Sequence, residues 1–243
     1  MARTFDGSND QVNFGAADIV DTLRPWTALC YVRITGNVVD ERQILIKMDS
    51  SYVGTMFIAA TGDGVNNNKI FSLSVQSVTP YSESAANVLV VNTWKVIVTT
   101  FTGTPGDSPK IYSCTPGGTL TEVSYTTQTG GSGTPDDSPA NLRLATRDSL
   151  DATFFAGGLA ECALWNRVLS STELNMLGLG YSALWIPQDL KFYCPVTGTS
   201  SPEPDLSGNG NTGTVTEAVQ LAHPPVIYSL DTEEHEVQTT VYS

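Results

Sequence analysis

The sequence contains little positive charge. Lys and Arg together number 12, against 25 Asp and Glu in 243 residues, so the formal net charge is −13. No run of basic residues is longer than two. Because proteins neutralise nucleic-acid phosphates with clustered Lys and Arg, this composition excludes nucleic acid as a partner.

Cysteine is scarce and dispersed. The four residues form no Cys-x-x-Cys motif and no Cys/His cluster, which excludes metal and redox motifs of that type. Three of the four lie in apolar, strand-like patterns, where cysteine is usually a buried free thiol. A chain of this length buries enough surface to fold without a disulfide. The cysteines are Cys30, Cys114, Cys162 and Cys194.

Long apolar stretches are also missing. No segment approaches the ~20 apolar residues that a membrane-spanning helix needs. The first ten residues, MARTFDGSND, lack the apolar core of a signal peptide. We therefore expect a protein with no membrane partner, made in the cytoplasm without an N-terminal export signal.

Ser, Thr, Gly and Asn are frequent in the sequence in place of charged residues. Charged residues make up only 15% of the chain, a composition that suits strands with solvated faces and frequent turns. Segments of alternating apolar and polar residues, separated by Gly, Pro, Asn and Asp, predict an antiparallel sandwich. The predicted strands are 26–34, 43–48, 54–60, 69–75, 93–101, 110–114, 120–127, 141–146 and 158–165.

One helix is predicted after these strands. Ser170 can cap its N-terminus, and Glu173, three residues later, completes a capping box. Gly178 is predicted to supply the left-handed residue that ends it. A helix of this length does not change the all-β class.

Several segments resemble the laminin-G-like family of concanavalin A-type jelly rolls. FAGGLAECALWNRVLSSTEL (155–174) is similar to the closing strand and helix of that family, although Ala160 stands where the family usually has Asp. Other segments resemble its earlier strands. They are FDGSNDQVNF (5–14), WTALCYVR (26–33), WKVIVTTFTG (94–103) and LRLATR (142–147). The resemblance implies an antiparallel jelly-roll β-sandwich.

The order of the family segments is permuted. The run 189–218 resembles the opening strand and following loop of the family, yet it comes after the closing strand and helix. The family's first strand is therefore expected to come from the C-terminal segment. DLKFYCPV (189–196) is predicted to pair beside the strand that begins at Arg3. Alternatively, it completes a neighbouring copy if the connection 178–187 swings outward.

We predict two parts in the chain. Residues 1–222 form one laminin-G-like sandwich, and residues 223–243 form an extended C-terminal arm. The arm is acidic and β-prone, which suits addition of a strand to the edge of a neighbouring subunit. Its candidate assembly residues are apolar or aromatic. They are Val226, Ile227, Tyr228, Val237, Val241 and Tyr242.

Catalytic motifs are missing. Retaining glycosidases need two carboxylates about 5–5.5 Å apart, and no E-x-D-x-x-E strand places such a pair here. Glu161 is the nearest candidate, but no second carboxylate follows it on its strand. The only histidines, His223 and His235, lie in the C-terminal segment, so the sandwich body lacks a histidine base. The sequence predicts a protein that is not an enzyme.

Two loops hold candidate calcium ligands. Asp205, Ser207, Asn209 and Asn211 in DLSGNGN bear oxygens at alternate positions, which suits a hard cation, and Asp205, Asn209 and Asn211 are the candidate ligands. The alternative is a tight turn that uses Asn and Gly at positive φ. Asp148 and Asp151 form the second candidate set. Asp6, Asn9 and Asp10 are instead expected to shape a turn.

The sequence identifies no glycan-binding residues. Trp26, Trp94 and Trp165 match packing positions, and the tyrosines in or near polar stretches, which can be exposed, show no grouping. These tyrosines are Tyr52, Tyr81 and Tyr125.

This layout is similar to laminin-G-like modules of tailed-phage virion proteins. The resemblance implies a non-enzymatic virion surface protein, a capsid decoration or tail-associated subunit that can bind cell-surface glycans. Its expected partners are other virion proteins and further copies of itself. The alternative is a free carbohydrate-binding lectin module, and a glycoside hydrolase is a third hypothesis.

Overall fold

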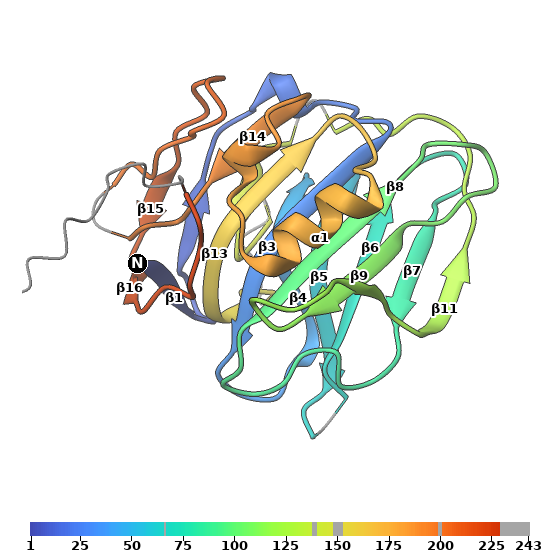
Figure 1. Cartoon of the computed structure of the whole chain (residues 1–243). Helices are drawn as coiled ribbons and strands as arrows, with labels where there is room; N and C mark the ends of the chain where they lie inside the picture. Colours follow the sequence, from blue (N-terminus) through green and yellow to red (C-terminus); the bar gives the residue numbers. More distant parts are fainter. Residues whose placement is uncertain (66, 138–139, 148–152, 199–200, 229–243) are drawn as a thin grey trace, which may run out of the picture.

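The alternating pattern is realised as strands in a computed structural model of the chain (Figure 1). The structure describes residues 1–65, 67–137, 140–147, 153–198 and 201–228. Two antiparallel sheets of eight strands each pack face to face, and one α-helix lies outside them. Within the described residues, no helix has the length and apolar character needed to span a bilayer.

The first sheet contains the predicted closing strand, β13. Its strands follow the order β10 (Thr121–Glu122), β9 (Lys110–Cys114), β8 (Lys95–Phe101), β3 (Trp26–Ile34), β13 (Ala156–Trp165), β1 (Ala2–Asp6) and β16 (Val219–Leu221). A further strand, β14 (Leu190–Cys194), also pairs with β13.

The second sheet faces the first across the core. Its order is β11 (Tyr125–Thr129), β7 (Tyr81–Ser84), β6 (Lys69–Ser74), β5 (Gly54–Asp63), β4 (Val39–Met48), β12 (Leu142–Leu144), β2 (Gln11–Asn13) and β15 (Thr214–Thr216). The predicted strand 120–127 is split between the two sheets, because β10 pairs with β9 and β11 pairs with β7.

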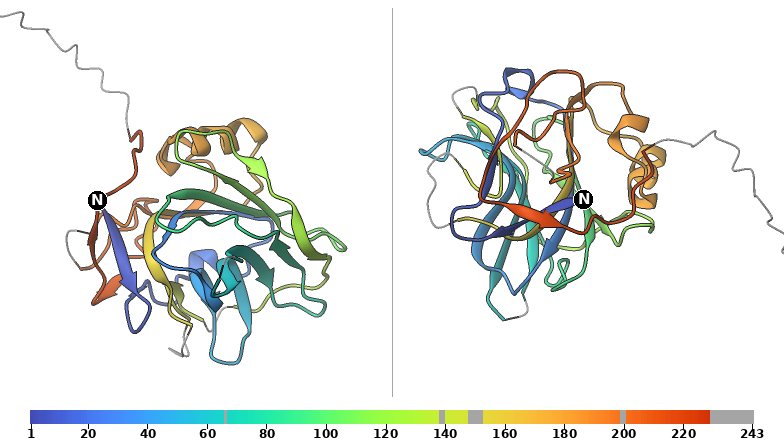
Figure 2. Two further views of the ribbon diagram at one scale, coloured as in Figure 1. Left: turned by 90° about the horizontal axis from the view of Figure 1, so that it is seen from below. Right: turned by 90° about the vertical axis from the view of Figure 1, so that its left-hand side faces the viewer.

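Strand β3 shows how the core is divided. Ala28, Cys30 and Val32 point into the main core between the sheets, while Leu29 and Tyr31 point to a second core beneath the helix. Successive side chains of a strand point to opposite faces, so one strand serves both cores. The helix, α1 (Ser171–Leu179), therefore covers the outer face of the first sheet (Figure 2).

The helix begins as predicted and ends two residues later than predicted. Ser170 accepts a hydrogen bond from Glu173 N, and the Glu173 carboxylate accepts one from Ser170 N, which confirms the capping box. The left-handed residue is Gly180, at φ 98°, so the prediction of Gly178 was wrong. Gly178 instead lies on the buried face, where a Cβ would stand 2.6 Å from the carbonyl oxygen of Gly118. Its small size serves packing rather than a turn.

The permuted segment closes the sandwich, but not beside the strand that begins at Arg3. Strand β14 pairs with residues 162–165 of β13, and β1 pairs with residues 156–159. The two strands therefore lie end to end along β13, on either side of an irregularity at Ala160–Ala163. Strand β16, further along the chain, takes the position beside β1.

Buried charges join this C-terminal half to the start of the chain. Arg3 Nε lies 2.6 Å from Glu203 Oε1, and both side chains are almost fully buried. Arg3 also donates to the carbonyl of Ala218, and Glu203 Oε1 accepts from Gly198 N. Charge-assisted hydrogen bonds of this kind offset the desolvation of the two ions.

The cysteine prediction is confirmed for the core. Cys30, Cys162 and Cys194 are free and buried, and Cys114 is half-buried. Burial raises the pKa of the Cys162 and Cys194 thiols well above the usual range, so both stay protonated and unreactive.

Candidate ligand-binding pocket

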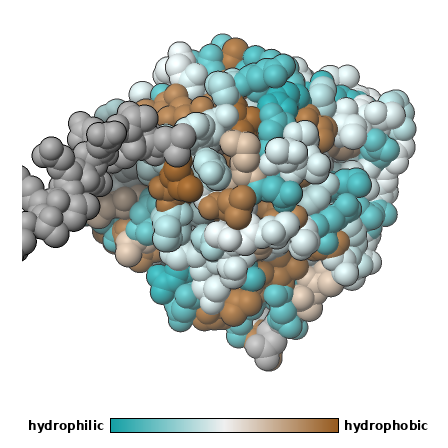
Figure 3. Space-filling view, viewed as in Figure 1, coloured by the Kyte–Doolittle hydropathy of each residue, from teal (hydrophilic) through white to brown (hydrophobic). Residues whose placement is uncertain are grey.

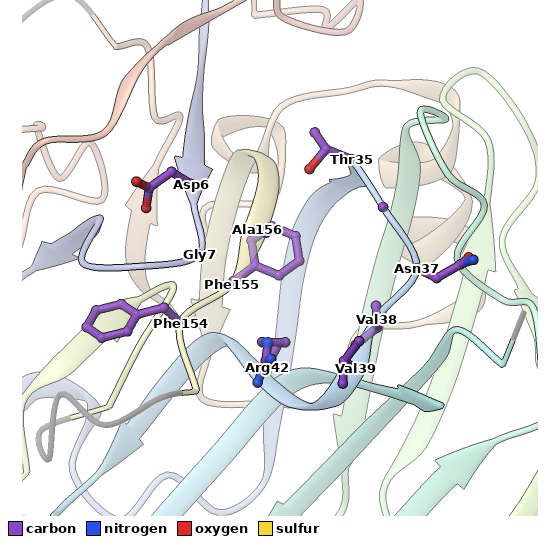
Figure 4. Close-up of a pocket in the computed structure, with 11 residues that line it drawn as sticks. Asp6, Gly7, Thr35, Asn37, Val38, Val39, Arg42, Phe154, Phe155 and Ala156 are labelled. Carbon is purple, nitrogen blue, oxygen red and sulfur yellow. The ribbon is translucent and has the colours of Figure 1, made fainter. Parts of the chain in front are cut away.

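A pocket opens at one end of the sandwich, where three segments meet (Figure 4). Asp6 and Gly7 line one side, Thr35 to Val39 the other, and Phe154 to Ala156 lie between them, with Arg42 below. Its volume is about 300 Å³, at the lower end of the range of roughly 300–1,000 Å³ for small-molecule sites. We call it the loop-end pocket.

The turn after β1 is shaped by its own carboxylates. Asp6 N donates to Asp10 Oδ2 at 2.8 Å, and Ser8 N donates to Asp6 Oδ1 at 2.8 Å. The prediction that a turn is shaped here is confirmed for Asp6 and Asp10, whereas the side chain of Asn9 donates to Glu217 Oε2 at 3.0 Å. Burial raises the pKa of Asp10, and the neighbouring charges of Asp6 and Glu217 act in the same direction.

Gly7 allows this turn to lie against β13. Its φ of +83° belongs to the left-handed region, and a Cβ there would stand 2.9 Å from the Cβ of Ala156. Only glycine meets both demands without strain. The wall formed by Asp6 is therefore held close to Ala156 at the start of β13.

The opposite wall is held by a buried amide. Asn68, 4% exposed, accepts from Val38 N at 2.8 Å and donates to Asn37 Oδ1 at 2.9 Å. Its backbone carbonyl oxygen accepts from Leu89 N. The 35–38 connection is thus fixed to two neighbouring loops before any ligand arrives, which lowers the entropic cost of binding.

Asn37 also borders a second hollow at the same end of the sandwich. This hollow has a volume of about 350 Å³ and is lined by asparagine amides and apolar side chains. The lining residues are Asn37, Asn68, Asn87, Leu89, Val90 and Val91. A ligand longer than the loop-end pocket has room to continue here.

The chemistry of the loop-end pocket is mixed. Phe154 and Phe155 give it an apolar surface, and Arg42 contributes a guanidinium. Among the described residues, Asp6 Oδ2 and the Thr35 hydroxyl make no hydrogen bond within the protein. These groups can exchange hydrogen bonds with hydroxyls of a small polar ligand.

A wider groove of about 510 Å³ lies between the 102–108 loop and strands β8 to β10. Four of its polar residues form two pairs: Lys110 Nζ lies 3.3 Å from Glu122 Oε2, and Thr102 donates to Asp107. Tyr125 also donates to Glu122. A ligand in this groove has to compete with these contacts, so the loop-end pocket is the stronger candidate.

The predicted calcium loop is organised by Asp205. Asp205 Oδ1 accepts from Tyr193 N and Ser207 N, and Oδ2 accepts from the backbone and side-chain nitrogens of Asn211. Asn209 donates its amide to Lys191 O. These contacts give both oxygens of the carboxylate hydrogen-bond donors and build a tight turn. Among the described residues, no three His, Cys, Asp or Glu side chains lie together as a metal site.

The second predicted calcium set, Asp148 and Asp151, lies outside the described residues. Calcium binding by either loop stays a prediction.

The aromatic residues separate into packing and surface groups. Trp26 and Trp165 are fully buried, and Trp94 packs at the edge of the second core, in agreement with the prediction. Tyr52 is exposed, but the Arg147 guanidinium lies over its ring, 3.5 Å from the centroid. Neither Tyr52 nor the other two tyrosines considered above lines the loop-end pocket.

Glu161 is inaccessible to a substrate. It is 1% exposed, at φ 54°, and both carboxylate oxygens are occupied. Tyr193 donates to Oε2 at 2.7 Å, Tyr228 donates to Oε1 at 2.6 Å, and His223 Nε2 lies 3.1 Å from Oε1. Both tyrosine pKa values are raised by burial and by the Glu161 charge.

The residues that cover Glu161 form a strap, residues 223–228. Ile227 N donates to Gly180 O at 2.7 Å, and Ile227 O accepts from Ser182 N at 3.0 Å. The predicted assembly residues Val226, Ile227 and Tyr228 therefore lie against their own sandwich. Val237, Val241 and Tyr242 lie outside the described residues. The role of all six in assembly stays a prediction.

Comparison with known proteins reveals a shared fold. No family model matches the sequence, and no curated protein matches it. A protein from Bacteroides ovatus ATCC 8483 that is described as carbohydrate-binding superposes with a TM-score of 0.57 at 14% identity. The match covers 93% of this chain and 61% of that one, so this chain spans less than two thirds of its length.

Two further solved structures are similar to smaller parts of the chain. The heptameric SAP-like pentraxin from Limulus polyphemus gives a TM-score of 0.49 at 10% identity, over 73% of this chain and 81% of that one. Domains LG4-5 of the mouse laminin α1 chain give 0.41 at 13%, over 67% and 40%. The likeness to the Bacteroides ovatus protein, at 14% identity, is one of fold alone. The two antiparallel sheets of this chain confirm the β-sandwich that the sequence predicts.

Sequence reasoning missed the loop-end pocket. The available signal was local, because FDGSND and TGN each read as a turn with polar side chains. Nothing in the pattern shows that these turns meet at Phe154.

Proposed function

We propose that this chain is a non-enzymatic glycan-binding protein and that the loop-end pocket is its sugar site. The observation that carries the proposal is a preorganised pocket with an apolar surface, in which Asp6 Oδ2 and the Thr35 hydroxyl have no hydrogen-bond partner among the described residues. A sugar ring offers an apolar face and several hydroxyls, which match this combination. The fold shared with a protein described as carbohydrate-binding supports the proposal by analogy.

We expect no glycoside hydrolysis because of where the candidate catalytic carboxylate lies. Hydrolysis of a glycoside needs an acid that reaches the leaving-group oxygen. Glu161, the candidate that the sequence offers, is covered by the strap and hydrogen-bonded on both oxygens. We therefore expect sugar to be bound and released unchanged.

A glycan array followed by calorimetry tests the site. Thr35→Ala removes an exposed hydroxyl that has no partner among the described residues, and Arg42→Gln removes the guanidinium. Each should weaken binding of a glycan found on the array by about tenfold, the equivalent of one lost polar contact of about 1.4 kcal/mol. Thr212→Ala, at an exposed threonine of the 205–213 loop, is the matched control and should bind as the wild type does.

Two results contradict this assignment. If no glycan binds, with or without calcium, the function is wrong. If binding falls with Tyr112→Ala and not with Thr35→Ala, the site is the wider groove. Repeating the array in a calcium chelator separates a cation-dependent lectin from the direct binding that we expect.

We further propose that the module works at the surface of a virion, as a decoration or tail-associated subunit. The family resemblance of the sequence motivates this setting, and the exposed side chains of Ile227 and Tyr228 on the strap are its candidate contacts with other subunits. Co-sedimentation with purified particles is the test. A protein that remains in the soluble fraction when particles are pelleted favours the free lectin module instead.

A further inference from the structure

The histidine of the strap stands between two oxygen acceptors. His223 Nδ1 lies 2.6 Å from the carbonyl oxygen of Pro224, and Nε2 lies 3.1 Å from Glu161 Oε1. A neutral imidazole has one N–H donor and one acceptor nitrogen, so it can donate to only one of these oxygens. The imidazolium form carries a proton on each nitrogen and fits both contacts. The geometry of the closed strap therefore favours protonated His223.

The contact between His223 and Glu161 is shielded from water. The His223 side chain is 11% exposed and the Glu161 side chain 1%. Val226 of the strap packs against the second core, and apolar atoms are exposed on this side of the molecule (Figure 3). Charges in such surroundings interact more strongly than charges on an open surface, because little water or salt screens them.

The other titratable groups around Glu161 are phenols. Tyr193 of β14 and Tyr228 of the strap donate to its carboxylate, and Tyr31 of β3 lies within electrostatic range of it. Burial raises the pKa of all three phenols, and the Glu161 charge acts in the same direction. They stay protonated between about pH 5 and 8, the range over which imidazoles titrate. His223 is therefore the member of this cluster that can change its charge at these pH values.

The chain after the strap is acidic and holds the other histidine. Residues 231–236 contain four carboxylates with His235 among them, and all of these residues lie outside the described part of the chain. Negative charge there favours a protonated imidazole at long range, in the same direction as Glu161 does. Salt screens such long-range contributions, but it screens a shielded contact at 3.1 Å much less. The two contributions can therefore be separated by experiment.

We propose that the strap is a proton-operated latch: protonation of His223 holds the strap on Glu161, and loss of that proton to solvent raises the population of the open strap. The closed strap binds more protons than the open strap, so closing is favoured as the pH falls and weakened as the pH rises. Opening uncovers Glu161 and frees Ile227 from its backbone partners in residues 180–182. The latch does not depend on what the loop-end pocket binds.

Hydrogen exchange at Ile227 N measures the latch in the full chain, because its hydrogen bond to Gly180 O belongs to the closed strap. The exchange rate is compared with the intrinsic rate at each pH, which gives a protection factor. In the wild type this factor should fall at least about tenfold between about pH 5 and 8, as expected when one hydrogen bond between charged groups is lost. The ring signals of His223 in NMR spectra should titrate together with this fall.

Three variants assign the effect to His223. His223→Gln keeps a polar side chain that does not titrate, so the protection factor at Ile227 N should be the same at every pH. His235→Gln, at the other histidine, is the matched control and should retain the wild-type dependence. Tyr228→Phe removes a donor from Glu161 but leaves the imidazole, so protection should be lower at every pH and should still fall. Circular dichroism checks that each variant is folded.

Several outcomes contradict the latch. A wild-type protection factor that does not change with pH overturns it, and so does a pH dependence that survives His223→Gln. A dependence that disappears in His235→Gln, or in about 0.5 M salt, also overturns it, because either result would assign the effect to the residues after the strap.

Discussion

The loop-end pocket and the buried region beneath the strap differ in whether their polar side chains have hydrogen-bond partners within the protein. At the pocket, Asp6 and Thr35 each keep an oxygen without a partner among the described residues. Beneath the strap, both oxygens of Glu161 are occupied by groups of the same chain. The first arrangement leaves hydrogen bonds for a ligand, and the second uses them to hold the chain together.

Burial explains this difference. An ionised carboxylate that is removed from water is tolerated only when donors replace its hydration. Glu161 and Glu203 are each 1% exposed, and both are supplied with donors by segments distant in sequence. Asp6 and Thr35 at the pocket remain in contact with water, which can hydrogen-bond to them. The fold therefore does not have to supply protein partners for these groups. Glu161 has donors on both oxygens, whereas Glu203 is paired through Oε1 and its Oε2 has no hydrogen-bond partner among the described residues.

The largest effect is expected from Arg3→Met. This change leaves the Glu203 carboxylate buried without its ionic partner, and we expect urea unfolding to show a loss of about 3–5 kcal/mol. Lys110→Met is the control, since its pair with Glu122 is exposed and should be worth about 0–1 kcal/mol. If both variants lose the same free energy of unfolding, the packing of the C-terminal half against the start of the chain does not depend on the buried Arg3–Glu203 pair.

Two glycine substitutions compare the pocket with the predicted calcium loop. Gly7 and Gly208 have φ values of +83° and +88°, but a Cβ has neighbouring atoms within 4 Å only at Gly7. Gly208→Ala should cost about 1 kcal/mol of stability from backbone strain. Gly7→Ala should cost roughly 1 kcal/mol more, from its contact with Ala156. Gly7→Ala should also weaken glycan binding, because it moves Asp6.

Thermal unfolding of both variants measures these costs, and calorimetry with a bound glycan measures the affinity. Identical losses of stability would remove the argument that close packing shapes the pocket wall.

Removal of one strap contact should have a smaller effect. Tyr228→Phe deletes a hydrogen bond to the buried Glu161 carboxylate and should cost about 1.5 kcal/mol. Hydrogen exchange should rise at Ile227 N, which lies next to the lost contact, and stay unchanged in β5. Faster exchange throughout both sheets would instead show that the strap is part of the global fold rather than a separable element.

The smallest effect concerns pH. Arg167 donates to Glu173 and, with Ser170, lowers the pKa of that carboxyl to about 2 from its usual 4.5. The folded state therefore binds fewer protons, so the stabilisation is fully present above about pH 4.5 and is lost as the pH falls towards 2. At neutral pH the free energy of unfolding of the wild type should exceed that of Glu173→Gln by less than about 1 kcal/mol. Urea titrations should show the difference vanishing in acid, and a difference that is constant with pH contradicts the assignment.

The sequence predicted most of the secondary structure and little of the site. The strand 26–34 matches β3 in full, because a period of two and β-prone residues are local properties. The capping box at Ser170 is equally local. The helix end was placed at Gly178 because a glycine in a pattern does not reveal whether it turns or packs. The pocket was missed because its walls are turns that lie far apart in the sequence and come together only in the folded chain.

The sequence by itself determined the all-β class, the free buried thiols and the low positive charge. It also determined that a segment resembling the opening of the jelly roll follows the close. Only the tertiary structure decided where that segment lies, end to end with β1 along β13. The same holds for the strap on Glu161 and for the approach of Asp6 to Phe154. Alternation sets which face of a strand is buried, whereas the choice of partner is set by packing between residues far apart in the chain.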